Sequence, residues 1–360
     1  MNYNKLLDGE ILAFNKAVDA CYPADDAETA DVSIDQQRKL YSAMSATLAA
    51  ELPADISFKD QSIPTTLQQT PLISDDIKDL PPDFSTSEVE IDTRLYTPVS
   101  DEVSTTDTVI VYMHGGGFIL GNLESHHDVC AEICKQTGRR VLSVDYRLAP
   151  EHHHPAAYND AVAAATYAVN NFSEVLLCGD SAGANLCAAV CSNHVALASR
   201  IKAQVLIYPA LHGCFNRKSH LEHAEAPHLS RDDLLFYSAI RVSEQYKSQV
   251  SRFADSESSK AAGILANLNN EDQAFFRTLN PMFIDDFSRI PVTTCFAAEC
   301  DPLHDDSTDY CNAINAAGRR AICISEAGLV HGYLRARHRS DRARKSFGSI
   351  VEELAQTSKT

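Results

Sequence analysis

The stretch EVLLCGDSAGANLCAAV, residues 174–190, contains the pattern that decides the fold. An apolar run leads into GDSAG, and an alanine-rich helical pattern follows. A serine in a G-x-S-x-G turn between a buried strand and a helix has a strained backbone, and only small flanking residues fit beside it. Gly179 and Gly183 leave that room. We expect the turn to hold the Ser181 hydroxyl above the sheet edge, where the helix beginning at Ala182 favours negative charge.

Further strand-like runs surround this turn, and helical stretches lie between most of them. Several of the runs are continuously apolar, which is typical of parallel strands buried on both faces. The sequence therefore predicts an α/β fold with a mainly parallel sheet covered by helices on both faces. The expected strands are residues 88–96, 108–114, 139–146, 174–180, 203–211, 291–299 and 320–327.

Two regions depart from the alternation of strands and helices. Residues 1–65 have a helical and then a loop-like pattern, and residues 212–285 are polar and rich in His and Ser with weaker helical stretches. Their weak internal patterning indicates additions around the sheet that depend on the main domain for burial.

A serine hydroxyl is a weak nucleophile at neutral pH, so the turn predicts a histidine base and a carboxylate at later strand ends, in the order Ser, Asp or Glu, His. Asp301 follows the strand-like run 291–299, and His331 follows the run 320–327. One helix and one strand fit between them, as adjacent units of a parallel sheet require. Ser181, Asp301 and His331 are therefore the predicted catalytic residues.

Three other carboxylates compete with Asp301 for the role of the acid. Asp305 and Asp306 are expected in the following helix, and Glu299 is expected within or at the end of the strand. Asp301 is favoured because it alone is expected just past the strand end.

The run HGGGF, residues 114–118, follows another apolar strand. A tetrahedral intermediate carries an alkoxide that needs preorganised donors, and glycines let backbone N–H groups approach it. Gly116, Gly117 and Ala182 are the predicted donors of this oxyanion hole. A phosphate-binding loop is disfavoured because GxGxxG and GK[ST] patterns are absent and no suitably placed acidic residue follows.

Histidine and cysteine clusters raise the question of a metal. Consecutive residues in His126–His127 and His152–His154 cannot all face one ion, and no carboxylate stands at ligand spacing. The Cys130/Cys134 and Cys187/Cys191 pairs lack a CxxC partner that would complete a zinc set. The eleven cysteines lie mostly in apolar segments, which is typical of reduced, buried thiols. We expect no metal and no organic cofactor.

Composition excludes several classes of protein. The 44% hydrophobic and 22% charged residues fit a globular domain. The net charge of −18 argues against a nucleic-acid partner, which Lys and Arg would have to neutralise. No run approaches the length of a membrane span. The N-terminus lacks a basic region followed by a purely apolar one, so we expect no signal peptide and a cytoplasmic location.

The motifs HGGGF, YRLAPE (146–151), GDSAG and DPL (301–303), together with the His331–Gly332 pair, occur in this order. In combination they resemble the hormone-sensitive lipase family of α/β-hydrolases, in particular its bacterial acetyl esterases, over roughly residues 85–340. The resemblance implies the triad and oxyanion donors named above, with His114, Tyr146 and Glu151 bracing the oxyanion loop. It also implies a helical cap made of residues 1–65 and 212–285, around a catalytic domain of residues 66–211 and 286–360.

The resemblance implies a serine carboxylesterase for small-molecule esters. A short acyl group, acetyl to butyryl, is expected because the segment 212–285 is polar and offers no long apolar stretch. Two alternatives stay open: an amidase or peptidase with the same triad, and a catalytically silent ligand-binding protein. Family members are often dimers, so the resemblance also suggests a homodimer.

Overall fold

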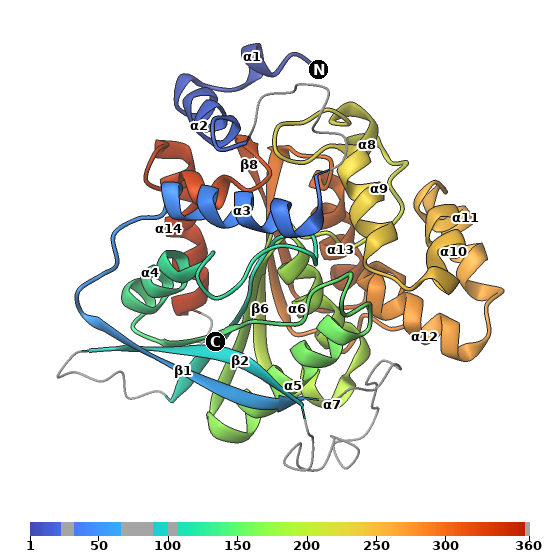
Figure 1. Ribbon diagram of the computed structural model, residues 1–360. Coiled ribbons are helices and arrows are strands. Elements are labelled where there is room, and N and C mark those ends of the chain that lie inside the picture. The colour runs from blue at the N-terminus through green and yellow to red at the C-terminus, as the bar shows by residue number, and fades with distance from the viewer. Residues whose placement is uncertain (23–31, 66–88, 100–106, 357–360) are drawn as a thin grey trace.

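An eight-stranded sheet runs through the middle of the molecule (Figure 1). The computed structural model describes residues 1–22, 32–65, 89–99 and 107–356. The strand order is β1-β2-β4-β3-β5-β6-β7-β8; β1/β2 and β2/β4 are antiparallel, and the other neighbours are parallel. The strands are β1 (Ile56–Thr65), β2 (Val89–Pro98), β3 (Thr108–Met113), β4 (Arg140–Val144), β5 (Glu174–Asp180), β6 (Ile201–Ile207), β7 (Val292–Cys300) and β8 (Ala321–Val330).

The predicted mainly parallel sheet is confirmed, and β2 to β8 correspond to the seven expected strands. The loop-like expectation for the end of the segment 1–65 is wrong, because residues 56–65 form the edge strand β1. Few β1 side chains are buried, so the strand lacks a regular apolar alternation and depends on its backbone pairing with β2. Buried Ile63 and the hydrogen bond from Thr65 Oγ1 to Asp160 Oδ1 (2.7 Å) fix its far end.

Helices cover both faces of the sheet. One core layer contains side chains of α5, α6 and α13. The opposite layer contains side chains of α2, α4 and α14. The helices are α1 (Tyr3–Leu6), α2 (Gly9–Asp19), α3 (Ile34–Leu48), α4 (His127–Thr137), α5 (Ala156–Asn171), α6 (Ala182–Asn193), α7 (Val195–Ala198), α8 (Lys218–Glu222), α9 (Arg231–Ile240), α10 (Glu244–Ala254), α11 (Ser258–Ala266), α12 (Asn270–Leu279), α13 (His304–Ala316) and α14 (Asp341–Gln356), with short 3-10 helices at Pro281–Phe283 and Tyr333–Ala336.

The helices of the two regions predicted as additions lie around one end of the sheet, whereas β1 of the first region is part of the sheet itself. Helix α3 crosses above the strands, and α8 to α12 follow one another beside them (Figure 1). The division into cap segments and a catalytic domain stays a prediction, and its boundary at residue 66 lies outside the described residues.

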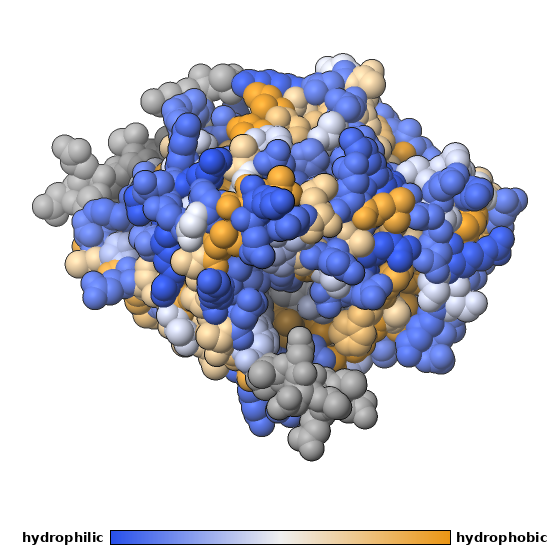
Figure 2. Space-filling model, turned by 90° about the horizontal axis from the view of Figure 1, so that it is seen from above, coloured by the Kyte–Doolittle hydropathy of each residue, from blue (hydrophilic) through white to orange (hydrophobic). Residues whose placement is uncertain are grey.

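The interior is apolar and the surface is mostly polar. Strand β3 is buried along its whole length, so both of its faces pack against helices. All cysteines are free, and all but Cys21 and Cys323 are buried. Figure 2 shows hydrophilic side chains over most of the face seen from above, broken by smaller hydrophobic areas. Within the described parts of the chain, no helix is long and apolar enough to span a membrane.

Buried histidines make the fold sensitive to acid. Burial lowers their pKa below the usual 6.5, so in the folded protein they stay neutral at pH values where the unfolded chain binds protons. The free energy of unfolding must therefore fall as the pH drops from about 6.5 towards 4. The pKa is lowered to about 4 for His114, His194, His212 and His228, and to about 3 for His220.

We predict that urea unfolding at pH 5.0 gives a smaller free energy of unfolding than at pH 7.5, by at most about 1.4 kcal/mol per pH unit for each histidine. His194→Gln should weaken this dependence, because the side chain is 1% exposed. The control is His152→Gln, at an exposed position. A free energy of unfolding that is the same at both pH values would contradict the prediction.

Candidate active site

The turn between β5 and α6 holds Ser181 in a strained conformation. Its backbone angles are φ 53° and ψ −116°, a region that side-chain-bearing residues rarely adopt. A β-carbon at Gly183 would overlap the carbonyl oxygen of Met113 on β3, and one at Gly179 would lie 2.7 Å from the Gly183 carbonyl carbon. Two glycines are thus needed for α6 to start so close to the sheet. The closeness of the helix forces the serine outward.

Ser181, His331 and Asp301 form a hydrogen-bonded chain. His331 Nε2 lies 2.9 Å from Ser181 Oγ, and His331 Nδ1 lies 2.7 Å from Asp301 Oδ2. Because an ionised carboxylate only accepts hydrogen bonds, Nδ1 carries the proton and Nε2 is free to accept one from the serine. Asp301 is fully buried, and its other oxygen accepts from the Leu303 amide at 2.9 Å. The three residues predicted to act together are therefore within hydrogen-bond reach.

The competing carboxylates are engaged elsewhere. Asp305 and Asp306 lie in α13, as expected. Glu299, on β7, accepts a hydrogen bond from the backbone amide of Gly328 at 2.7 Å. Of the four acids weighed, Asp301 is the one hydrogen-bonded to the His331 ring.

The glycine loop after β3 lies beside the serine. Gly116 (φ 130°) and Gly117 (φ 60°) have left-handed backbone angles that their lack of a side chain allows. Both line the same cavity as Ser181 and His331. The amide of Ala182 is among the first N–H groups of α6, which have no partner inside the helix. The three predicted donors therefore border the space above the serine hydroxyl.

A buried carboxylate anchors the glycine loop from below. Asp180 Oδ1 accepts hydrogen bonds from the Gly115 amide (2.9 Å) and from the Tyr112 hydroxyl (2.8 Å). Burial raises the pKa of Asp180, but the adjacent His126 ring and the Tyr112 hydrogen bond outweigh it and hold the pKa below its usual range. A fixed negative charge thus holds the loop next to the nucleophile.

His114, Tyr146 and Glu151, which the resemblance assigned to bracing the oxyanion loop, contact that loop or the segments next to it. The Tyr146 hydroxyl donates to the His114 carbonyl at 2.6 Å, and the two rings stack with centroids 4.4 Å apart. Glu151 pairs with Arg38 of α3 at 2.7 Å, and the same guanidinium donates to the Ile119 carbonyl at 2.8 Å. Helix α3 is thereby tied to the chain that continues from the glycine loop.

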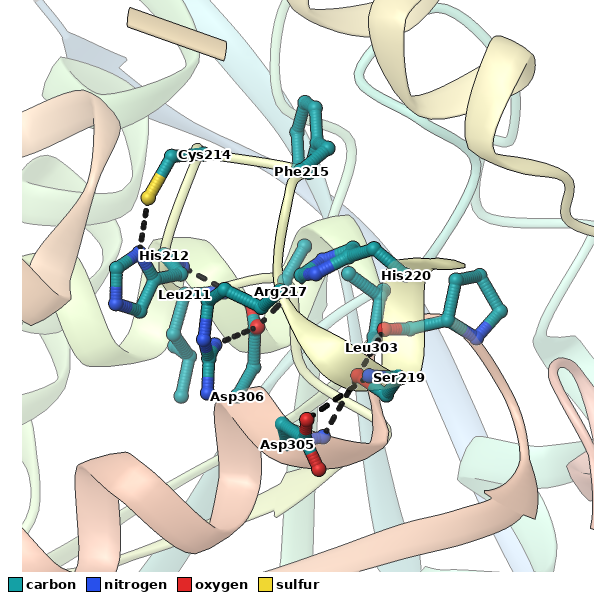
Figure 3. A network of polar contacts seen from close by, with 12 residues as sticks. Leu211, His212, Cys214, Phe215, Arg217, Ser219, His220, Leu303, Asp305 and Asp306 are labelled. Atoms are coloured by element: carbon teal, nitrogen blue, oxygen red, sulfur yellow. Dashed lines mark hydrogen bonds and ion pairs between the residues drawn. The ribbon is translucent and has the colours of Figure 1, made fainter. Parts of the chain in front are cut away.

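A second network holds the loop that follows β7 and carries the acid (Figure 3). Asp306, fully buried, accepts from the backbone amides at positions 211–212 (2.8 and 2.9 Å) and from Arg217 Nη1 (2.7 Å). Ser219 Oγ donates to the Pro302 carbonyl at 2.7 Å. Burial raises the pKa of Asp306, and Arg217 opposes that shift. The segment after β6 and the acid loop therefore hold each other in place.

The adjacent histidines point to different partners. His126 lies 3.4 Å from Asp180, while His127 bonds the Tyr96 hydroxyl at 2.7 Å. His154 is buried and lies 2.9 Å from a threonine hydroxyl of α12. In the described portion of the chain, no three His, Cys, Asp or Glu side chains are grouped so as to hold a metal ion.

A cavity of about 880 Å³ opens above Ser181. Its walls come from α2, α3, α9 and the loops at the strand ends. Apolar side chains such as Phe14, Leu234 and Tyr237 alternate with charged ones, including Arg241 and Arg335. The sequence did not indicate the cavity arginines, because neither belongs to a catalytic motif and their place in the cavity wall depends on how the chain folds.

Comparison with known proteins gives relatives over most of the chain. Residues 110–335 match the family described as alpha/beta hydrolase fold. The ethyl acetate hydrolase of Pseudomonas putida is 27% identical over 273 residues, covering 73% of this chain and 77% of the relative. The carboxylesterase NlhH of Mycobacterium tuberculosis is 31% identical over 259 residues, covering 68% of this chain and 72% of the relative.

Solved structures share the fold along almost the whole chain. A hyperthermophilic esterase from the archaeon Pyrobaculum calidifontis has a TM-score of 0.76 at 25% identity, covering 98% of this chain and 99% of that one. A bacterial heroin esterase has a TM-score of 0.75 at 22% identity and covers 98% of both chains, which is a likeness of fold alone.

We predict that Gly183→Ala lowers the thermal unfolding midpoint and moves the serine, since its methyl group would meet the Met113 carbonyl. Gly348→Ala on α14 is the matched control: nothing lies within 4 Å of its added carbon, and alanine favours a helix by about 1 kcal/mol. Equal midpoints for the two variants would show that the close contact at Gly183 is unimportant.

Proposed function

The chain belongs to the hormone-sensitive lipase-like family of α/β hydrolases and is a carboxylic ester hydrolase, and from this premise we propose that it cleaves short-chain esters through an acyl-enzyme on Ser181. The observation that carries the proposal is the hydrogen-bonded chain of Asp301, His331 and Ser181 at the cavity wall.

In the proposed mechanism, Ser181 Oγ attacks the ester carbonyl carbon while His331 Nε2 takes the hydroxyl proton. The carbonyl oxygen becomes an alkoxide, which the amides of Gly116, Gly117 and Ala182 stabilise. His331 then gives the proton to the leaving alcohol, and an acyl group stays on the serine. Water, deprotonated by the same imidazole, releases the acid in a second passage through a tetrahedral intermediate.

Asp301 acts through the imidazole in this scheme. By accepting the Nδ1 proton it fixes the tautomer that leaves Nε2 free to act as the base, and it stabilises the imidazolium that forms. Its complete burial strengthens the electrostatic interaction with the histidine.

A short acyl group fits the charged walls of the cavity. Arg241, Arg335 and Asp233 interrupt the apolar lining, and burying a long hydrocarbon chain beside charged groups would cost their hydration. The relative named ethyl acetate hydrolase supports the same preference. The homodimer and the cytoplasmic location inferred from the sequence stay predictions.

We expect wild type to hydrolyse p-nitrophenyl acetate, and Ser181→Ala to lower kcat by about a millionfold because the nucleophile is lost. Asp301→Asn should lower kcat by about ten-thousandfold, since an amide favours the wrong imidazole tautomer. Asp305→Asn is the control that removes a neighbouring carboxylate. Activity near wild type in Asp301→Asn would refute the role of Asp301, and a matched anilide cleaved as fast as the ester would favour the amidase alternative.

The acyl preference is tested with p-nitrophenyl esters from acetyl to palmitoyl. The value of kcat/KM should be highest between acetyl and butyryl and should fall for longer chains. A value that climbs steadily to palmitoyl would overturn the short-chain proposal.

A further inference from the structure

Arg241, the residue that caps the C-terminus of α9, is a buried cation that has no acidic partner among the residues the structure describes. Its side chain is 7% exposed and lines the cavity above Ser181. In the described ranges of the chain, no hydrogen bond or ion pair holds its guanidinium nitrogens. The guanidinium lies instead over the ring of Phe118, 3.5 Å from the ring centre.

The three described acidic side chains that line the cavity do not pair with Arg241. Asp180 is engaged by the glycine loop and His126, and Asp233 accepts from the Ser230 amide and hydroxyl at 2.8 and 2.7 Å. Asp19 is exposed. None of these three carboxylates lies within ion-pair distance of Arg241, although all of them border the same cavity.

The second arginine of the cavity, Arg335, differs from Arg241 because its guanidinium is hydrogen-bonded. Arg335 donates to the Ser125 carbonyl at 3.1 Å and to the Tyr41 hydroxyl at 3.0 Å, so two of its nitrogens are engaged. Arg241 has only the aromatic ring, and a cation–π contact offsets only part of the cost of taking an unpaired charge out of water.

Arg241 lies beside the glycine loop that carries the predicted oxyanion donors. Tyr237, one turn earlier on α9, lies against Gly117: a β-carbon there would be 2.7 Å from its ring. Arg241 lies over Phe118, the next residue of the same loop. Helix α9 therefore places the guanidinium beside the oxyanion loop, on the wall of the cavity that receives the ester.

We propose that Arg241 is a specificity-determining residue that binds a carboxylate carried by the ester substrate. This inference rests on the proposed esterase function and names the substrate class more closely: a short ester bearing an anionic group. The guanidinium presents paired N–H donors that match a carboxylate. Burial lowers the pKa of Arg241 to about 9, which leaves it protonated at neutral pH. The charge of the whole chain, −18, would repel such a substrate, so recognition must be local.

The carboxylate belongs either to the acyl part or to the alcohol part of the ester. Two pairs of substrates distinguish these two positions. Ethyl hydrogen succinate against ethyl 4-methylpentanoate tests the acyl side. The 4-acetoxybenzoate anion against 4-isopropylphenyl acetate, a neutral compound of similar shape with a single ester bond, tests the alcohol side. For each pair, acid release in a pH-stat gives the ratio of kcat/KM for the anionic to the neutral ester.

In Arg241→Met the ratio should fall about 10- to 100-fold in at least one pair, the loss expected for a charged hydrogen bond. The pair that responds identifies the side. Arg241→Lys, which keeps the charge but loses the paired donors, should give an intermediate ratio. Arg252→Met on α10 removes an exposed cation and should leave both ratios unchanged. Thermal unfolding should show that Arg241→Met is folded, since removing an unpaired buried charge does not destabilise the protein.

Ratios in Arg241→Met equal to those of wild type in both pairs would overturn the inference. That outcome is distinct from a failure of the esterase proposal, in which wild type would leave the neutral esters and p-nitrophenyl acetate intact.

Discussion

The close approach of α6 to the sheet is the constraint on which the site depends. Gly183 packs against the Met113 carbonyl without room for a methyl group, so the turn before the helix has one sharp course. Ser181 takes the strain of that turn at φ 53°. This conformation places Ser181 Oγ 2.9 Å from His331 Nε2, at a helix N-terminus where negative charge is favoured.

Two buried carboxylates hold the loops around this serine. Asp180 fixes the glycine loop through the Gly115 amide, and Asp306 fixes the acid loop to the segment after β6. Neither is hydrogen-bonded to the His331 ring in the structure. Both are buried, and hydrogen bonds to a buried charged group are strong and costly to lose. The charges therefore keep loops from different strands in one geometry, as electrostatic preorganisation requires.

The parallel sheet and the three residues of the hydrogen-bonded chain could be predicted from the sequence. Buried parallel strands are continuously apolar and a nucleophile turn requires glycines, so both produce recognisable local patterns in the sequence. Strand β1 has no such pattern, because few of its side chains are buried and its order comes from backbone pairing with β2. The proposed role of Arg241 could not be predicted from the sequence either. It depends on the contact with the Phe118 ring and on the cavity wall, which only the folded chain brings together.

The central claim, that Ser181 is the nucleophile, is tested most directly by covalent trapping. The protein would be treated with a fluorophosphonate, which phosphonylates activated serines, and the adduct would be located by peptide mass spectrometry. The account predicts one adduct per chain, on Ser181, and slow labelling in His331→Ala because the base is missing. An adduct on another serine, or a chain that hydrolyses esters at full rate after labelling of Ser181, would contradict it.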